Sequence, residues 1–260
     1  MIDTLRLAVG TLTVFRVRPP ARVDVRVAGR ALALAPAVGL VLALVAEAVV
    51  LAVRWLVPGL TDRFLAASLA LATLAVLTRG LHLDGLADTA DGLGSGKRDA
   101  DAVELMHRPE VGAFGVSAVA LTLLVQVSAL DVALLRGRGT VALLGGVVVS
   151  RLALTVANRR GVEAATGSRL GSTVAGTVSP ALLATSAALT VAFLALLGWW
   201  EDDAPTSFVL HVWLAAAIAL VVSGLLVHRC RQRFGGLTGD VLGAACEIAF
   251  ATYVVVICLR

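Results

Sequence analysis

Three aspartates, Asp84, Asp88 and Asp91, fall within eight residues of the chain. Their spacing of i, i+4 and i+7 places all three carboxylates on one face of a helix. Carboxylates that close repel one another, and each charge costs about 2.5–3.5 kcal/mol near the centre of a bilayer. A divalent cation relieves both penalties, and Mg²⁺ commonly binds one or two carboxylates together with substrate phosphates. The pattern therefore predicts a magnesium site for phosphoryl transfer, with a solvated acidic helix end as the alternative.

Polar residues flank this cluster on both sides. His82 precedes it by two residues, and its imidazole could bind a phosphate or carry a proton, although an interfacial histidine explains it equally well. The run from Gly92 to Arg98 resembles a phosphate-binding P-loop but fails the pattern twice. Asp91 occupies its first glycine position, and Arg98 stands where Ser or Thr is required. We therefore predict a flexible turn in which Lys97 and Arg98 are available to contact phosphate.

A second acidic segment lies near the C-terminus. Asp240 and Glu247 are seven residues apart, so they lie on a similar helix face. Acidic residues within membrane segments are functional by default, whereas packing alone explains the glycines spaced by four around Asp240. If the N-terminus is cytoplasmic, both acidic segments begin on the cytoplasmic side of the membrane. We therefore expect their carboxylates to meet at one metal site. Arg151 lies within an apolar segment and needs an anion, either a carboxylate or a substrate phosphate.

The elements that position these residues are expected to be membrane helices. Hydrophobic residues make up 58% of the 260-residue chain and charged residues only 15%, against roughly 25% charged residues in a typical soluble domain. A membrane-spanning helix needs about 20 mostly apolar residues, and seven segments approach that length. The second and fourth are short, and we expect the second to continue as a helix through the aspartates. The predicted spans are residues 31–56, 64–80, 112–135, 140–157, 181–200, 207–227 and 238–259, with an interfacial helix over residues 5–15.

Charge placement predicts the orientation of these spans. A cytoplasmic N-terminus puts most of the 22 Lys and Arg residues inside and the acidic run 201–203 outside, as the positive-inside rule requires. We therefore predict an all-α polytopic bundle of about seven transmembrane helices. The net charge of +4 forms no basic patch interleaved with aromatic residues, which argues against nucleic-acid binding. Residues 1–30 lack the cleavage site of a signal peptide, and residues 1–260 are predicted to form one transmembrane catalytic domain.

The run GLHLDGLADTADGL, residues 80–93, resembles the signature of the cobalamin synthase family, also called adenosylcobinamide-GDP ribazoletransferases. Further motifs match in order along nearly the whole chain, and the C-terminal glycine–aspartate motif is the most specific of them. These motifs are the threonine–arginine–proline segment 13–19, the proline–glycine motif 36–39, residues 104–115, the pair Ser150-Arg151 and the glycine–aspartate motif 236–247.

The resemblance implies a magnesium-dependent transferase of the inner membrane with its active site facing the cytoplasm. Such an enzyme joins adenosylcobinamide-GDP to α-ribazole or α-ribazole 5′-phosphate, releases GMP and completes cobalamin assembly. Carried over to this chain, Asp84, Asp88 and Asp91 are the expected catalytic and metal-binding residues. Other cobalamin-assembly enzymes or a second copy of the chain are the expected protein partners. The expected substrate-binding residues are His82, Lys97, Arg98, Arg151, Asp240 and Glu247.

Some positions depart from the family pattern. The family often has an acidic residue shortly after Met106, where this chain has His107, and Phe250 stands where a second glutamate often follows. Two other functions stay open on the acidic residues. One is a CDP-alcohol-type lipid phosphotransferase, whose pattern has an arginine where Asp88 stands. The other is a cation-coupled transporter that uses the acids as ion sites, although the two acidic segments are not obvious repeats.

Overall fold

The structure, a computed structural model, describes residues 1–57, 62–200 and 205–259, and every regular element within these ranges is helical. The only strand-like pairings there are two isolated β-bridges. The predicted all-α fold is therefore confirmed. In chain order the elements are α1 (Ile2–Leu12), α2 (Val25–Ala33), α3 (Ala35–Leu56), α4 (Asp62–Leu77), α5 (Leu81–Gly94), α6 (Asp99–Met106), α7 (Ala113–Leu135), the π-helical turn η1 (Val141–Gly145), α8 (Gly146–Ala157), α9 (Arg169–Val174), α10 (Pro180–Trp200), α11 (Pro205–Phe234) and α12 (Gly239–Cys258).

Five helices in the described ranges, α3, α7, α10, α11 and α12, are long and apolar enough to cross a membrane. A sixth crossing results if α4 and α5, which meet at an angle of 88°, count as one broken span. The span expected over residues 140–157 is a shorter apolar helix made of η1 and α8. The polytopic membrane prediction is confirmed, with five or six candidate spans where about seven were predicted.

Helix α12 is the central helix of the bundle. It packs against α5, α7, α8 and α11, and 67% of its most apolar stretch is buried, compared with 22% for α10. Phe250, Tyr253 and Val254 on α12 belong to the large hydrophobic core that also includes residues of α3, α4, α7 and α8. An acidic residue on this helix is therefore surrounded mainly by protein, which is where membrane proteins place functional charges.

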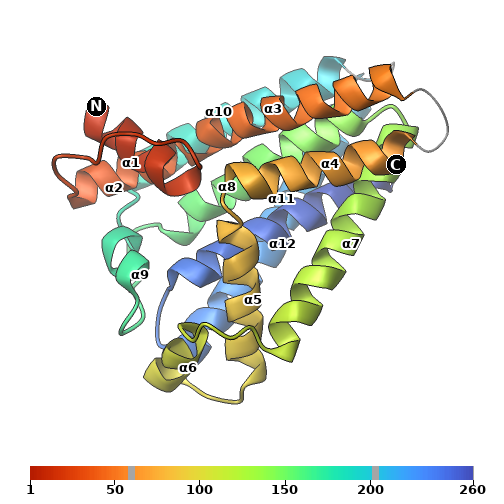
Figure 1. The fold of residues 1–260 in the computed structure, drawn as a ribbon. Coiled ribbons are helices and arrows are strands. Elements are labelled where there is room, and N and C mark those ends of the chain that lie inside the picture. Colours follow the sequence, from red (N-terminus) through yellow and green to blue (C-terminus); the bar gives the residue numbers. More distant parts are fainter. Residues whose placement is uncertain (58–61, 201–204, 260) are drawn as a thin grey trace.

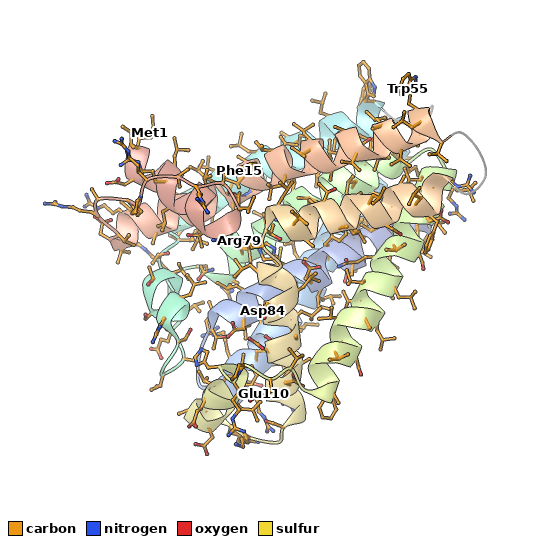
Figure 2. The ribbon with its side chains drawn as sticks, viewed as in Figure 1. Met1, Phe15, Trp55, Arg79, Asp84 and Glu110 are labelled. Atoms are coloured by element: carbon orange, nitrogen blue, oxygen red, sulfur yellow. The ribbon has the colours of Figure 1, made fainter. Side chains whose placement is uncertain are left out.

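The chain turns sharply between α4 and α5, so the expectation that the second span continues as one helix through the aspartates is wrong. Arg79 and Gly80 both adopt left-handed backbone, with φ of 57° and 68°. The Gly80 amide donates to the Ala75 carbonyl (2.7 Å) and the Arg79 amide to the Val76 carbonyl (3.0 Å). These are the two hydrogen bonds of a Schellman motif, which ends a helix. Figure 2 shows Arg79 at this turn and Asp84 further along α5.

The N-terminal helices lie at one end of the long helices, and the C-terminus lies at the other end (Figure 1). Helix α1 is the helix expected over residues 5–15, and it is attached to the turn between α4 and α5. The Val14 amide donates to the Leu77 carbonyl (2.7 Å), and Arg79 Nη2 donates to the Gly10 carbonyl (3.2 Å). Helix α9 packs against α2 and α12. These short elements therefore enclose the region where α5 and α12 begin.

Candidate functional site

Helices α5 and α12 cross in direct backbone contact at two glycines. A Cβ atom placed on Gly85 would lie 2.7 Å from the Asp240 carbonyl oxygen and 3.1 Å from Gly243 Cα. A Cβ atom placed on Gly243 would lie 3.1 Å from the His82 carbonyl oxygen. Real Cβ atoms essentially never approach backbone closer than 3.0 Å, so position 85 requires glycine for this crossing. The contact sets the first turn of α12 against the aspartate face of α5.

Four carboxylates gather at this crossing. The negative charges of Asp84, Asp91 and Asp240 all act on Asp88, and Asp84 also acts on Asp240. The Thr238 hydroxyl caps the N-terminus of α12 and so fixes where Asp240 lies. Within the described ranges, no Lys or Arg forms an ion pair with any of the four. The structure therefore brings Asp240 beside the predicted aspartate cluster, and no Lys or Arg of the described ranges pairs with it there.

The Asp91 carboxylate has a structural partner that its spacing does not reveal. Its Oδ2 accepts a hydrogen bond from the Gly112 amide (2.7 Å), and its Oδ1 accepts one from the Gly115 amide (2.9 Å). These amides belong to the N-terminus of α7, where backbone donors have no partner within the helix. Asp91 therefore caps α7 and links it to α5. Each carboxylate oxygen keeps a further lone pair, so capping does not prevent metal binding.

The chemistry of the carboxylate cluster fits a hard divalent cation. Asp84, Asp88 and Asp240 supply the oxygen donors that Mg²⁺ prefers. The described residues contain no three His, Cys, Asp or Glu side chains already converged on one point. Mg²⁺ usually keeps several waters and completes its coordination with substrate phosphates. An Mg²⁺ ion bound here would therefore need only two of these carboxylates, with substrate phosphate and water as its other ligands.

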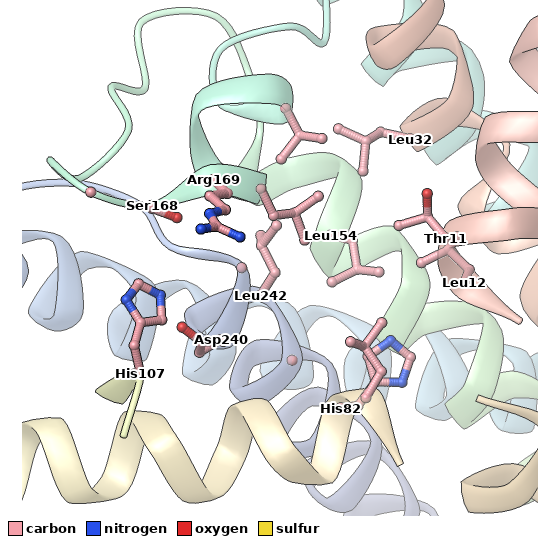
Figure 3. A pocket seen from close by; sticks show the side chains of 16 residues that line it. Thr11, Leu12, Leu32, His82, His107, Leu154, Ser168, Arg169, Asp240 and Leu242 are labelled. Carbon is pink, nitrogen blue, oxygen red and sulfur yellow. The ribbon is translucent and has the colours of Figure 1, made fainter. Parts of the chain in front are cut away.

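A cavity of about 620 Å³ opens beside the cluster, between α1, α2, α5, α8, α9 and α12. This volume lies within the range of roughly 300–1,000 Å³ that is typical of small-molecule sites. Figure 3 shows His107, Arg169 and Asp240 around one part of the cavity, and Leu32 and Leu154 along another. The cavity is therefore amphipathic, with charged groups near the carboxylate cluster and an apolar wall away from it.

A second polar group is buried between α5, α7, α8 and α12. Gln126 Nε2 donates to Glu247 Oε2 (2.8 Å), and Arg151 Nη1 donates to Ser150 Oγ (2.8 Å). Only 3% of His82 is exposed, and its Nε2 atom has no hydrogen-bond partner within the described ranges. A gap of about 30 Å³ beside these residues has room for a water molecule. His82 borders both this gap and the large cavity, so it connects the two.

The six expected substrate-binding residues thus separate into three places. Asp240 lies at the cavity, and His82, Arg151 and Glu247 lie in the buried polar group. The remaining two, Lys97 and Arg98, are exposed in the connection between α5 and α6 and do not line the cavity.

Sequence reasoning missed two nitrogen-bearing side chains of the cavity, those of His107 and Arg169. His107 follows α6 and Arg169 is the first residue of α9, both far from Asp240 in the chain, so no local spacing relates them to Asp240. The one available signal was His107 itself, which stands close to where the family often has an acid. Gln126 was also missed, because a single amide in an apolar helix has no pattern of its own.

Comparisons with known proteins agree with the resemblance. The sequence profile of the family described as cobalamin-5-phosphate synthase matches residues 4–258. An adenosylcobinamide-GDP ribazoletransferase of Frankia casuarinae is 42% identical over 265 residues, which cover 100% of this chain and 95% of the relative. A protein of the same name from a Nocardioides species is 39% identical over 254 residues, 96% of each chain. Another, from Syntrophobacter fumaroxidans, is 37% identical over 193 residues, 73% of this chain and 72% of the relative. No solved structure matches the chain significantly.

Proposed function

The chain belongs to the cobalamin-5-phosphate synthase family, and from this membership we propose that it joins adenosylcobinamide-GDP to α-ribazole or α-ribazole 5′-phosphate and releases GMP. This reaction is the final step of cobalamin assembly, and the protein is a transferase. The observation that carries the proposal is the carboxylate cluster at the crossing of α5 and α12, one member of which, Asp240, lines a cavity of about 620 Å³.

Asp84 and Asp88 are proposed as the principal ligands of Mg²⁺. They lie one helical turn apart on the same face of α5, and the described ranges hold no cationic side chain in ion-pair contact with either. Bound there, Mg²⁺ would offset the charge of the pyrophosphate and of the departing GMP. Asp91 is proposed as a further ligand through its remaining lone pairs, in addition to its contacts with α7.

The reaction exchanges one oxygen for another at phosphorus. A ribose hydroxyl of the ribazole forms a bond to the phosphate that carries the corrinoid, and the bond from that phosphate to the GMP oxygen breaks. The hydroxyl proton needs an acceptor, and Asp240 is proposed for this role because it lines the cavity beside the aspartate cluster. Lys97 and Arg98 are proposed to contact phosphate groups that extend beyond the cavity.

The apolar helices make this a multi-pass membrane protein. We propose that the end carrying α1, α2 and the carboxylate cluster faces the cytoplasm, since Arg16, Arg18, Arg22 and Arg26 are concentrated and exposed there. In this proposal the whole chain is one catalytic domain of the inner membrane. Association with other cobalamin-assembly enzymes or with a second copy remains a prediction.

Family membership favours this function over the two alternatives. The profile match covers the aspartates of α5 and the acids of α12 together, which a lipid phosphotransferase or a transporter would not require in this combination.

A product assay tests the proposal. The protein is purified in nanodiscs and supplied with adenosylcobinamide-GDP, α-ribazole 5′-phosphate and Mg²⁺, and mass spectrometry detects GMP and the joined corrinoid. We expect product from the wild type, none from Asp84→Asn, and normal product from the control Asp101→Asn, which changes an exposed aspartate on α6. Full activity of the Asp84→Asn variant would contradict the assignment of the site.

A further inference from the structure

The large cavity combines two chemical surfaces that suit the two ends of one kind of ligand. One surface is hydrocarbon, made by Leu12, Leu32, Leu154 and Val174 of four different helices. The other surface carries Arg169 and His107 together with Asp240 (Figure 3). A ligand that fills the cavity therefore needs an apolar end and an anionic end, with its reacting atoms between them and close to the carboxylate cluster.

Arg169 is the strongest anion-binding group of the cavity. Its guanidinium is directed into the cavity in Figure 3, and within the described ranges it forms no ion pair with an acidic side chain. The neighbouring Ser168 hydroxyl accepts a hydrogen bond from the Gly171 amide (3.1 Å), which leaves its O–H free to donate. His107 lies on the other side of the cavity and close enough for its charge to act on Asp240. Arginine and histidine side chains placed this way can hold a phosphate from two sides.

The apolar surface suits the base of α-ribazole better than the guanine base of adenosylcobinamide-GDP. Guanine carries an exocyclic oxygen, an exocyclic amine and a ring N–H, and burying these groups without partners is costly. The leucine and valine side chains offer no such partners. α-Ribazole is a riboside of dimethylbenzimidazole, a base whose exposed edge is two methyl groups. Burial of those methyl groups against the hydrocarbon surface is favourable.

We propose that this cavity is the binding site for the ribazole substrate, with its base against Leu12, Leu32 and Leu154 and its 5′-phosphate between Arg169 and His107. The inference rests on the proposed function and specifies one substrate site within it. In this arrangement the ribose lies between the two surfaces and its hydroxyls face Asp240. The larger corrinoid then approaches the aspartates from outside the cavity and is not enclosed by it.

The proposal is tested by measuring the KM for α-ribazole 5′-phosphate, for free α-ribazole and for adenosylcobinamide-GDP. In Arg169→Gln we expect the KM for α-ribazole 5′-phosphate to rise about 10- to 100-fold, because a charge-assisted contact is lost. The KM for free α-ribazole and the KM for adenosylcobinamide-GDP should stay within about twofold of the wild-type values. The matched control is Arg160→Gln, an exposed arginine outside the cavity, which should change none of the three constants. A rise confined to the KM for adenosylcobinamide-GDP would assign the cavity to the GDP substrate and overturn the proposal.

A direct binding measurement tests the proposed ribazole site independently of turnover. Titration calorimetry with α-ribazole 5′-phosphate alone should give binding to the wild type and to Arg160→Gln, and at least 10-fold weaker binding to Arg169→Gln. If the wild type binds this ligand but forms no product, the proposed reaction fails while the binding site stands. If the wild type forms product but Arg169→Gln binds the ligand as tightly as the wild type, the site assignment fails while the reaction stands.

Discussion

Gly85 of α5 lies against Gly243 of α12 so closely that a side chain on Gly85 would contact the α12 backbone, at 2.7 Å from the Asp240 carbonyl oxygen. This contact is what holds the carboxylates of the two helices together. We predict that Gly85→Ala separates the helices, abolishes activity and lowers the melting temperature of the protein, because overpacking of this kind costs about 1–3 kcal/mol.

The chain offers a matched control for this glycine. Gly224 lies within α11, and a Cβ atom added there would have no described neighbour within 4 Å. Gly224→Ala should therefore leave activity unchanged and the melting temperature unchanged or slightly higher. Activity assays and thermal melts of the three proteins in the same lipid would check this. Equal effects of the two substitutions would show that helix propensity, and not the crossing, is responsible.

Asp91 and Asp84 of α5 should contribute differently, the first to stability and the second to activity. Asp91 accepts hydrogen bonds from two backbone amides of α7, so Asp91→Ala should lower stability by about 0.5–2 kcal/mol, the usual effect of losing a cap. Asp84 is exposed and makes no ion pair within the described ranges, so Asp84→Asn should leave the melting temperature nearly unchanged while activity is lost. Thermal melts and product assays on both variants would show whether the two roles separate in this way.

Removal of divalent metal should stop the reaction. A chelator is expected to abolish product formation by the wild type, and added Mg²⁺ is expected to restore it, because Asp84 and Asp88 together with the substrate pyrophosphate would hold the ion. The Mg²⁺ concentration required for half-maximal activity should rise by at least 10-fold in Asp88→Asn. Product formation that persists in the chelator, after dialysis of the protein, would argue against a metal at this cluster.

The buried pair of Gln126 and Glu247 predicts an energetic coupling. Gln126 is 1% exposed and donates to the Glu247 carboxylate at 2.8 Å, so Gln126→Leu would leave a buried acceptor without its donor. The expected loss is about 1–3 kcal/mol. The double variant Gln126→Leu with Glu247→Leu should recover part of that loss, because both polar groups are then absent. Gln232→Leu, at an exposed position of α11, is the control and should be nearly neutral.

Long apolar segments made most of the fold predictable. The span expected over residues 112–135 is α7, Ala113–Leu135, and the span expected over 238–259 is α12, Gly239–Cys258. Hydrophobic length alone is enough for these helices, because a bilayer requires about 20 apolar residues to cross it. The turn at Arg79 and Gly80 was missed although Thr78, Arg79 and Gly80 interrupt the apolar run. An interruption this short does not show whether the helix continues, and the left-handed backbone of Arg79 and Gly80 decides the geometry.

The site was harder to predict because its geometry depends on contacts between distant segments. Spacing placed Asp240 and Glu247 on a similar face of one helix, yet they have different neighbours. Asp240 lies against α5, whereas Glu247 accepts a hydrogen bond from Gln126 of α7. The α7 amides that bind Asp91 come 21 and 24 residues after it in the chain. Periodicity within one helix carries no information about either contact.

The angle of 88° between α4 and α5 also bears on how substrates reach the enzyme. If α4 stands along the membrane normal, α5 lies in the plane of the bilayer, and its carboxylates run along the boundary between lipid and water. A corrinoid adsorbed to that boundary would then meet the metal by lateral diffusion in two dimensions. Its density on the membrane surface, and not its concentration in solution, would set how often the enzyme encounters it.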